Sequence, residues 1–189
     1  MATFTVVYDA CLFYPAPLRD LVIRLAQTRS FRARWTADIQ REWVTALLRD
    51  RPELDEARLA RTVALMNKAV PDCLVTGYEH LIDQLSLPDP NDRHVLAAAI
   101  LCGAQEIVTT NLKDFPQEAL AAFKIVPRHP DDFVLDLADL EPAVVTTAAK
   151  LQRAALKDPA ISPREFVSIL RRQGLPGVAA FLQNEIELI

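Results

Sequence analysis

The chain has 189 residues, of which 51% are hydrophobic and 24% charged, and this composition is typical of a globular protein with one domain or one domain plus a small appendage. A net charge of −4 argues against broad nucleic-acid binding but leaves room for local basic patches. No basic leader precedes Asp9 and no apolar run approaches about 18 residues, so we expect no signal peptide, no membrane span and a cytoplasmic location. Three cysteines at unrelated spacings predict buried, reduced thiols: Cys11, Cys73 and Cys102.

The first part of the chain predicts one strand followed by three helices. Residues 5–9 are rich in β-branched and aromatic side chains and end in Asp9, which predicts a strand with an acid at its carboxyl end. Phe31 to Trp35 then serves as a connection between helices. Apolar residues at helical spacing predict the helices at residues 18–26, from Thr36 as N-cap to about Pro52, and at 55–69.

The stretch LPDPNDRHVLAAAILCGAQEIVTTNLKDFP, residues 87–116, organises the rest of the chain. Prolines and cap-forming residues predict a buried helix that begins near Asp92 and ends before Gly103. A β-branched run over 107–109 predicts a strand, and Asn111 and Asp114 follow it. These two residues should therefore lie at the carboxyl end of a strand, where ligands bind in open α/β sheets.

The remaining segments complete an alternation of strands and helices. A strand at 73–76 and a short helix at 78–85 come before the organising stretch, and a short helix at 116–123 and a strand at 124–126 follow it. Such alternation implies a parallel sheet covered on both faces. After His129 we expect a helical tail, with helices over 141–156, from the Ser162 capping box to Gly174, and over 175–188. The tail could cover the domain, pair two subunits or hold a partner protein.

Acids from distant parts of the chain are the candidate functional groups. Taken alone, Asp92 is most simply a helix cap and Asp114 a loop residue. Asp9, however, belongs to the same sheet edge as Asp114. Two carboxylates ~4 Å apart repel by ~4 kcal/mol at an effective dielectric of 20, so several converging acids require a cation. Oxygen ligands alone favour Mg²⁺ or Mn²⁺ over Zn²⁺, and a water activated by such an ion can hydrolyse a phosphodiester.

Four motifs together resemble the PIN-domain ribonucleases, and most closely the VapC-like toxins of type II toxin-antitoxin pairs. They are Asp9 after the opening strand, Glu42 in IQREW, DPNDRHVLAAA, and IVTTNLKDFP, and the resemblance covers residues 3–135. It implies a three-layer α/β/α fold with a central parallel sheet over residues 1–135 and a C-terminal helical extension over 136–189. It also implies a Mg²⁺- or Mn²⁺-dependent endoribonuclease with an RNA substrate, a cognate antitoxin protein and a homodimer.

Carried over by position, the family's acidic quartet falls on Asp9, Glu42, Asp92 and Asp114. We expect Asp9, Asp92 and Asp114 to bind the metal and Glu42 to orient or deprotonate the attacking water. The sequence departs from the pattern at Asn111, where many relatives have Asp. The missing negative charge puts a second metal position in doubt more than the first.

Several neighbours are predicted to support the acids or to bind RNA. The Thr109 hydroxyl follows the strand directly and can hold a carboxylate by a hydrogen bond, and Asn111 is expected in the same outer layer. Basic residues could form a rim that attracts phosphate, although each is also a typical solvated side chain. The candidate RNA-binding residues are Arg29, Arg32, Arg34, Arg93 and His94. His94 is otherwise a structural histidine that hydrogen-bonds locally.

Two other functions are compatible with the residues. The acidic net charge and Asn111 favour a non-catalytic RNA- or protein-binding module that has lost efficient metal binding. Calorimetry with Mn²⁺ separates this module from the enzyme. An aspartyl-phosphate enzyme also carries Asp after its first strand, but Asp9-Ala10-Cys11 lacks the second acid that the phosphatase arrangement uses two residues on.

Overall fold

The computed structural model describes residues 4–189 and contains a parallel sheet of four strands. The strands are β1 (Thr5–Tyr8), β2 (Arg32–Arg34), β3 (Glu106–Val108) and β4 (Val126–Arg128), in the order β2-β1-β3-β4. In the register of the sheet, Val6 lies opposite Ala33 and Val7 opposite Ile107. Because all pairings are parallel, the carboxyl ends of the strands share one edge. Residues 1–3 of the predicted nuclease domain lie outside the described range.

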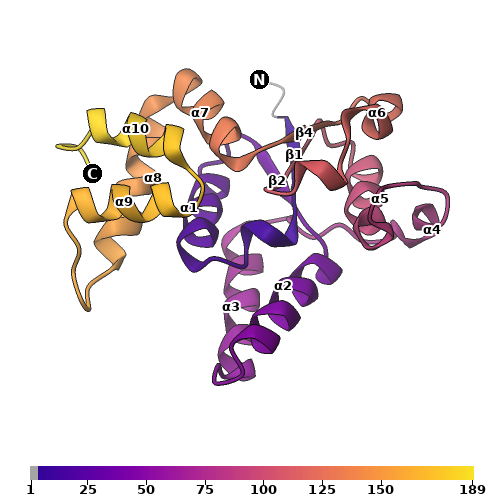
Figure 1. Cartoon of the computed structure of the whole chain (residues 1–189), viewed down its shortest axis with the longest axis horizontal. Coiled ribbons are helices and arrows are strands. Elements are labelled where there is room, and N and C mark those ends of the chain that lie inside the picture. Colours follow the sequence, from indigo (N-terminus) through magenta and orange to yellow (C-terminus); the bar gives the residue numbers. More distant parts are fainter. Residues whose placement is uncertain (1–3) are drawn as a thin grey trace.

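Helices surround this sheet (Figure 1). They are α1 (Ala16–Gln27), α2 (Ala37–Asp50), α3 (Glu56–Ala69), α4 (Glu79–Ile82), α5 (Arg93–Leu101), α6 (Gln117–Leu120), α7 (Pro130–Leu140), α8 (Pro142–Ala155), α9 (Pro163–Arg172) and α10 (Pro176–Asn184). Single turns of 3-10 helix lie between them: η1 (Ala10–Leu12), η2 (Pro90–Asp92), η3 (Leu112–Asp114) and η4 (Ala121–Phe123). None of the helices in residues 4–189 is long and apolar enough to span a bilayer.

The two faces of the sheet bury different kinds of side chain. On one face the Tyr8 ring lies edge-on to Phe133 of α7, with ring centroids 6.3 Å apart, and its hydroxyl donates to the Val22 carbonyl of α1. On the other side, α5 packs against β1 and β3 through a run of fully buried residues, Val95–Ala99. These contacts confirm the predicted three-layer α/β/α architecture.

Most helix boundaries follow the predicted caps. The Thr36 side chain accepts from the Ile39 amide at the start of α2, and Ser162 and Glu165 form the predicted capping box of α9. The connection predicted at 31–35 instead contains β2. In this edge strand only Ala33 is buried, while Arg32 is exposed and Arg34 is partly exposed.

The prediction of a strand at 73–76 was wrong. This segment makes only a single bridge, between Trp35 and Leu74. Asp72 and Gly77 take positive φ angles of 58° and 84°, so the chain turns on both sides of the segment. The neighbouring chain offers no longer partner, because β2 ends at Arg34 and α2 begins at Ala37.

The C-terminal helices share the hydrophobic core of the sheet domain. Phe166, Leu170 and Leu182 belong to the same buried cluster as Val6 and Val7. The predicted division after residue 135 falls inside α7, which packs against both α8 and α10, and the division itself stays a prediction.

One buried carboxylate fixes the start of α10 against α7. Asp131 accepts from the backbone amides of Gly177 and Val178, both at 2.8 Å. A β-carbon at position 177 would meet Cδ1 at the end of the Leu135 side chain, so a larger residue there would require Leu135 to move.

Candidate metal centre at the carboxyl edge of the sheet

Asp9 is the first residue after β1 and is only 5% exposed. Its amide donates to the Val108 carbonyl of β3, which continues the sheet ladder by one residue and fixes the backbone. Its carboxylate accepts hydrogen bonds from the Ala10 amide at 2.7 Å and from the Thr109 hydroxyl at 2.7 Å. The acid is therefore held between the carboxyl ends of two adjacent strands.

The loop after β3 links Asp9 to a second acid. Thr109 is fully buried, and its hydroxyl oxygen accepts from the Asn111 amide at 2.9 Å while donating to Asp9. The Asn111 side-chain amide in turn donates to the Asp114 carboxylate. Thr109 and Asn111 thus make the contacts expected of groups that position neighbouring carboxylates.

Asp92 reaches the same edge from the start of α5. The sequence suggested Asp92 as a cap, but the capping bond comes from Asp89, whose carboxylate accepts from the Asn91 amide. The Asp92 side chain makes no capping bond. Burial raises the pKa of Asp92 to about 7, and Asp9, Asp89, Glu42 and Asp114 add to the shift in that order. All four predicted acids therefore lie close enough to interact electrostatically.

Glu42 lies on α2, beside the fully buried Trp43, and its side chain is about half exposed. One oxygen of its carboxylate lies 3.3 Å from Nε2 of His94, which follows Asp92 by two residues on α5. His94 thus contacts one of the predicted acids, and its role in RNA binding stays a prediction. Its other ring nitrogen, Nδ1, is buried and has no hydrogen-bond partner in the described part of the chain.

The acidic cluster lacks compensating positive charge in the described residues. Neither lysine nor arginine forms an ion pair with Asp9, Asp92 or Asp114 within residues 4–189. Burial raises the pKa of Asp9, and nearby Glu42 adds to the rise, although bonds from Thr109, Cys11 and Ala10 oppose it. Excess negative charge on oxygen donors is the environment that suits Mg²⁺ or Mn²⁺.

The side chains as they stand are not arranged as a finished ligand set. Across residues 4–189, no three His, Cys, Asp or Glu side chains are grouped so that they could hold one ion. Repulsion between like charges works against their closer approach, and a cation would remove that repulsion. The donor chemistry fits a divalent cation, and side-chain movements would be needed to bind it.

Cys11 was not predicted as part of the site. Its thiol lies 3.2 Å from the Asp9 carboxylate and 3.4 Å from the Thr109 hydroxyl, and it accepts from the Thr110 amide. Burial, with the adjacent Asp9 charge, raises the pKa of Cys11 to about 12, so the thiol stays protonated and can donate to Asp9. The sequence feature that could have revealed Cys11 is its position two residues after Asp9, because a 3-10 turn brings residue i+2 back over its N-cap.

The predicted RNA-binding arginines fall into two places. Arg93 adjoins Asp92, and its Nε donates to the Pro90 carbonyl. Arg29, Arg32 and Arg34 instead surround a separate hollow of about 300 Å³ that is also lined by Val70, Pro71 and Asp72. These three arginines form no ion pair with the acids in residues 4–189, and their role in RNA binding stays a prediction.

Comparisons with known proteins show the family of the chain. A model of the PIN domain matches residues 5–113, and a model of the VapC50 C-terminal domain matches residues 130–184. The chain is 38% identical over 127 residues to a Mycobacterium tuberculosis protein named "Putative ribonuclease VapC50". The matched region covers 65% of this chain and 74% of that protein. No solved structure matches the chain. The chain belongs to the PIN domain family.

Proposed function

We propose that the protein is an endoribonuclease that depends on Mg²⁺ or Mn²⁺ and hydrolyses RNA phosphodiester bonds. Membership of the PIN domain family and similarity to a protein named as a ribonuclease support a nuclease. The observation that carries the finer proposal is the raised pKa of Asp92, about 7, because three other predicted acids contribute to it from separate elements. Such a cluster costs folding free energy unless a cation occupies it.

In this proposal Asp9, Asp92 and Asp114 hold the cation. Thr109 and Ala10 keep the Asp9 carboxylate in place, and Asn111 does the same for Asp114. When bound, a divalent cation lowers the pKa of water and offsets the charge that develops on a phosphodiester under attack. Glu42, positioned by its contact with His94, accepts a proton from the attacking water or orients that water.

We further propose that the enzyme is the toxin of a toxin-antitoxin pair, with a cognate antitoxin protein, a homodimeric state and a cytoplasmic location. The support is the similarity to VapC50, since this name places the relative among the VapC toxins that the sequence resembles. Arg93, which lies next to Asp92, is proposed to contact the RNA backbone.

The test is cleavage of a labelled single-stranded RNA by purified protein freed of any inhibitor. We expect cleavage with Mg²⁺ or Mn²⁺, none with a chelator, and a loss of at least about 100-fold in Asp9→Asn. Asp132→Asn is a matched control, because Asp132 is exposed on α7 and should keep full activity. Equal cleavage by the wild type and Asp9→Asn would refute the proposal.

A non-catalytic RNA- or protein-binding module is the second candidate. Its support is Asn111, which places an amide against Asp114 where many relatives have another acid. This module would bind RNA but would show no Mn²⁺ binding at millimolar metal in a calorimeter and no cleavage.

A further inference from the structure

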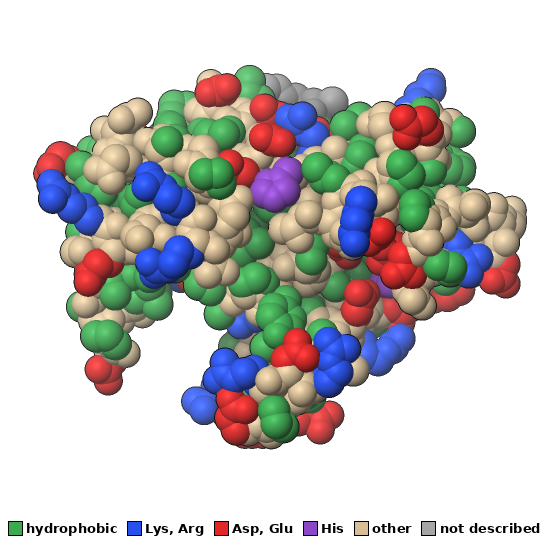
Figure 2. Space-filling view, in the orientation of Figure 1, with side chains coloured by type: hydrophobic (Ala, Val, Ile, Leu, Met, Phe, Trp, Pro, Cys, Tyr) green, Lys and Arg blue, Asp and Glu red, His purple; other side chains and the backbone are tan. Residues whose placement is uncertain are grey.

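A groove separates the sheet domain from the C-terminal helices. It has a volume of about 610 Å³, and its walls come from α1, α3, α9 and the end of α8. Figure 2 shows it as a notch between the lobe that carries α8 and α9 and the lobe formed by α2 and α3. None of the predicted metal ligands lines it.

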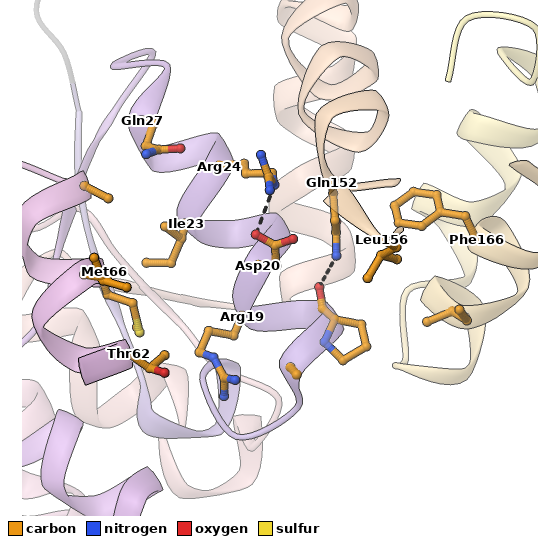
Figure 3. Close-up of a pocket in the computed structure, with 15 residues that line it drawn as sticks. Arg19, Asp20, Ile23, Arg24, Gln27, Thr62, Met66, Gln152, Leu156 and Phe166 are labelled. Carbon is orange, nitrogen blue, oxygen red and sulfur yellow. Dashed lines mark hydrogen bonds and ion pairs between the residues drawn. The ribbon is translucent and has the colours of Figure 1, made fainter. Parts of the chain in front are cut away.

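The walls of the groove are largely apolar. Ile23 of α1 and Met66 of α3 face Leu156 and Phe166 across it (Figure 3). At its mouth Leu65 is 55% exposed and Leu156 is 42% exposed, so two large side chains of opposite walls are left in water. Covering them would be favourable by the hydrophobic effect.

The charges in and around the groove are predominantly positive. Arg19 and Arg24 line it and Asp20 is the one acid among its lining residues. Asp20 pairs with Arg24 at 3.0 Å, whereas no carboxylate in residues 4–189 lies within ion-pair distance of Arg19. Arg19 is instead held by the Phe13 carbonyl at 2.5 Å and lies 4.7 Å from the Trp43 ring centre. Burial lowers the pKa of Arg19, and the nearby Asp20 charge only partly opposes this shift.

Other positively charged side chains lie along the edge of the groove. Arg58 and Arg61 are exposed on α3, four residues before Thr62 and Leu65 of the groove wall, so they occupy the same side of the helix. On α9, Arg172 is exposed three residues after Ile169 of the groove wall, so it lies on the same side of the helix. Glu165, four residues before Ile169, is the acid on that side. An occupant with negative charges along both flanks would complement this rim.

The backbone around the groove favours a helical occupant. Its lining residues lie on helices or immediately after one, so their peptide groups are already paired within each helix. No strand edge borders the groove to receive an extended peptide. The lining part of α3, from Thr62 to Ala69, runs about 10 Å, or two helical turns. We propose that this groove binds an acidic amphipathic helix of a partner protein, with its apolar face against Leu65, Met66 and Leu156 and its acids toward Arg19 and Arg61.

The proposal is tested by fluorescence polarisation with full-length protein in a chelator. The probe is a labelled peptide of about 18 residues with leucines spaced three and four apart and glutamates at the flanking positions. A twin peptide carries lysine in place of glutamate, and a second twin carries a central proline that breaks the helix. We expect saturable micromolar binding of the glutamate peptide and at least about tenfold weaker binding of both twins.

Substitutions test whether the peptide binds in the groove. Leu65→Glu should weaken binding of the glutamate peptide at least about tenfold, and Arg58→Glu with Arg61→Glu should shift preference toward the lysine twin. Leu140→Glu is the matched control, because Leu140 is 76% exposed on α7 and does not line the groove. Circular dichroism checks that each variant is folded.

Several results would overturn the proposal. They are the absence of saturable binding, equal binding of the glutamate and lysine peptides, and unchanged binding by Leu65→Glu. Displacement of the peptide by RNA would assign the groove to RNA, and a dimer in sedimentation that Leu65→Glu dissociates would assign it to a second copy of this chain. None of these readings uses nuclease activity, so the proposal and the enzyme assignment can fail separately.

Discussion

Two buried carboxylates in this molecule have opposite surroundings. Asp131, 8% exposed, accepts two backbone amides at the start of α10, at 2.8 Å each. Asp9, 5% exposed, also accepts hydrogen bonds, but it lies near Glu42 and Asp92, and its pKa is raised mainly by burial. Burial alone therefore does not separate a structural acid from a functional one.

What separates them is the charge that surrounds each group. Amide dipoles from a helix N-terminus stabilise the negative charge of Asp131, so that it joins two helices. Like charges around Asp9 and Asp92 destabilise the folded protein at neutral pH, and a cation is the partner that reverses the effect. The first arrangement contributes to stability, and the second costs stability and forms the metal site that we propose.

The largest expected effect on stability is at Asp131. Asp131→Ala leaves two buried amides of α10 without acceptors, which should lower the free energy of unfolding by about 2–3 kcal/mol. Urea denaturation measures this change, and Asp132→Ala, on the exposed side of α7, should stay within about 0.5 kcal/mol of the wild type. Equal losses in the two variants would show that Asp131 does not join the helices.

The next effect is a pH dependence caused by Asp92. Its pKa is about 7 in the folded protein and 3.8 ordinarily, so between these values the folded state binds more protons than the unfolded state. In a chelator, stability should therefore fall as pH rises from 4 to 7. Asp92→Asn should reduce this fall, with Asp9 accounting for what remains, and, after solvent screening is allowed for, stabilise the protein by about 1–2 kcal/mol at pH 8. An identical pH profile for variant and wild type in urea denaturation would contradict the assignment.

A smaller effect is expected at Thr109. Thr109→Val removes the hydroxyl that donates to Asp9 while keeping the side-chain shape, and should weaken Mn²⁺ binding about tenfold in calorimetry. Thr110→Val is the matched control, because Thr110 is exposed next to it and its hydroxyl does not donate to the Asp9 carboxylate. If both variants bind Mn²⁺ as the wild type does, Thr109 does not position the Asp9 carboxylate.

The sequence was sufficient to predict the elements whose signals are local. Caps such as Thr36 and Ser162 act within one helical turn, and the placement of Asp9 and Asp114 at one edge follows from two strands of a parallel sheet. Apolar periodicity likewise predicted the three C-terminal helices.

What the sequence could not provide depends on contacts between distant residues. β2 is stabilised by its pairing with β1, although its own residues are mostly charged. The contact between His94 and Glu42 joins α5 to α2, and the hydrogen bonds of Cys11 reach across to β3 and its loop. The same limit applies to Arg32 and Arg34, whose surroundings are set by the neighbouring turn at Pro71 and Asp72.

The central claim is that Asp9, Asp92 and Asp114, from three separate parts of the chain, share one cation, and anomalous scattering from a crystal grown with Mn²⁺ tests it most directly. We predict a single strong manganese peak bounded by carboxylate oxygens of Asp9, Asp92 and Asp114, which disappears in Asp92→Asn crystals. A wild-type crystal with no peak among these three side chains, at a metal concentration that supports cleavage, would contradict the account.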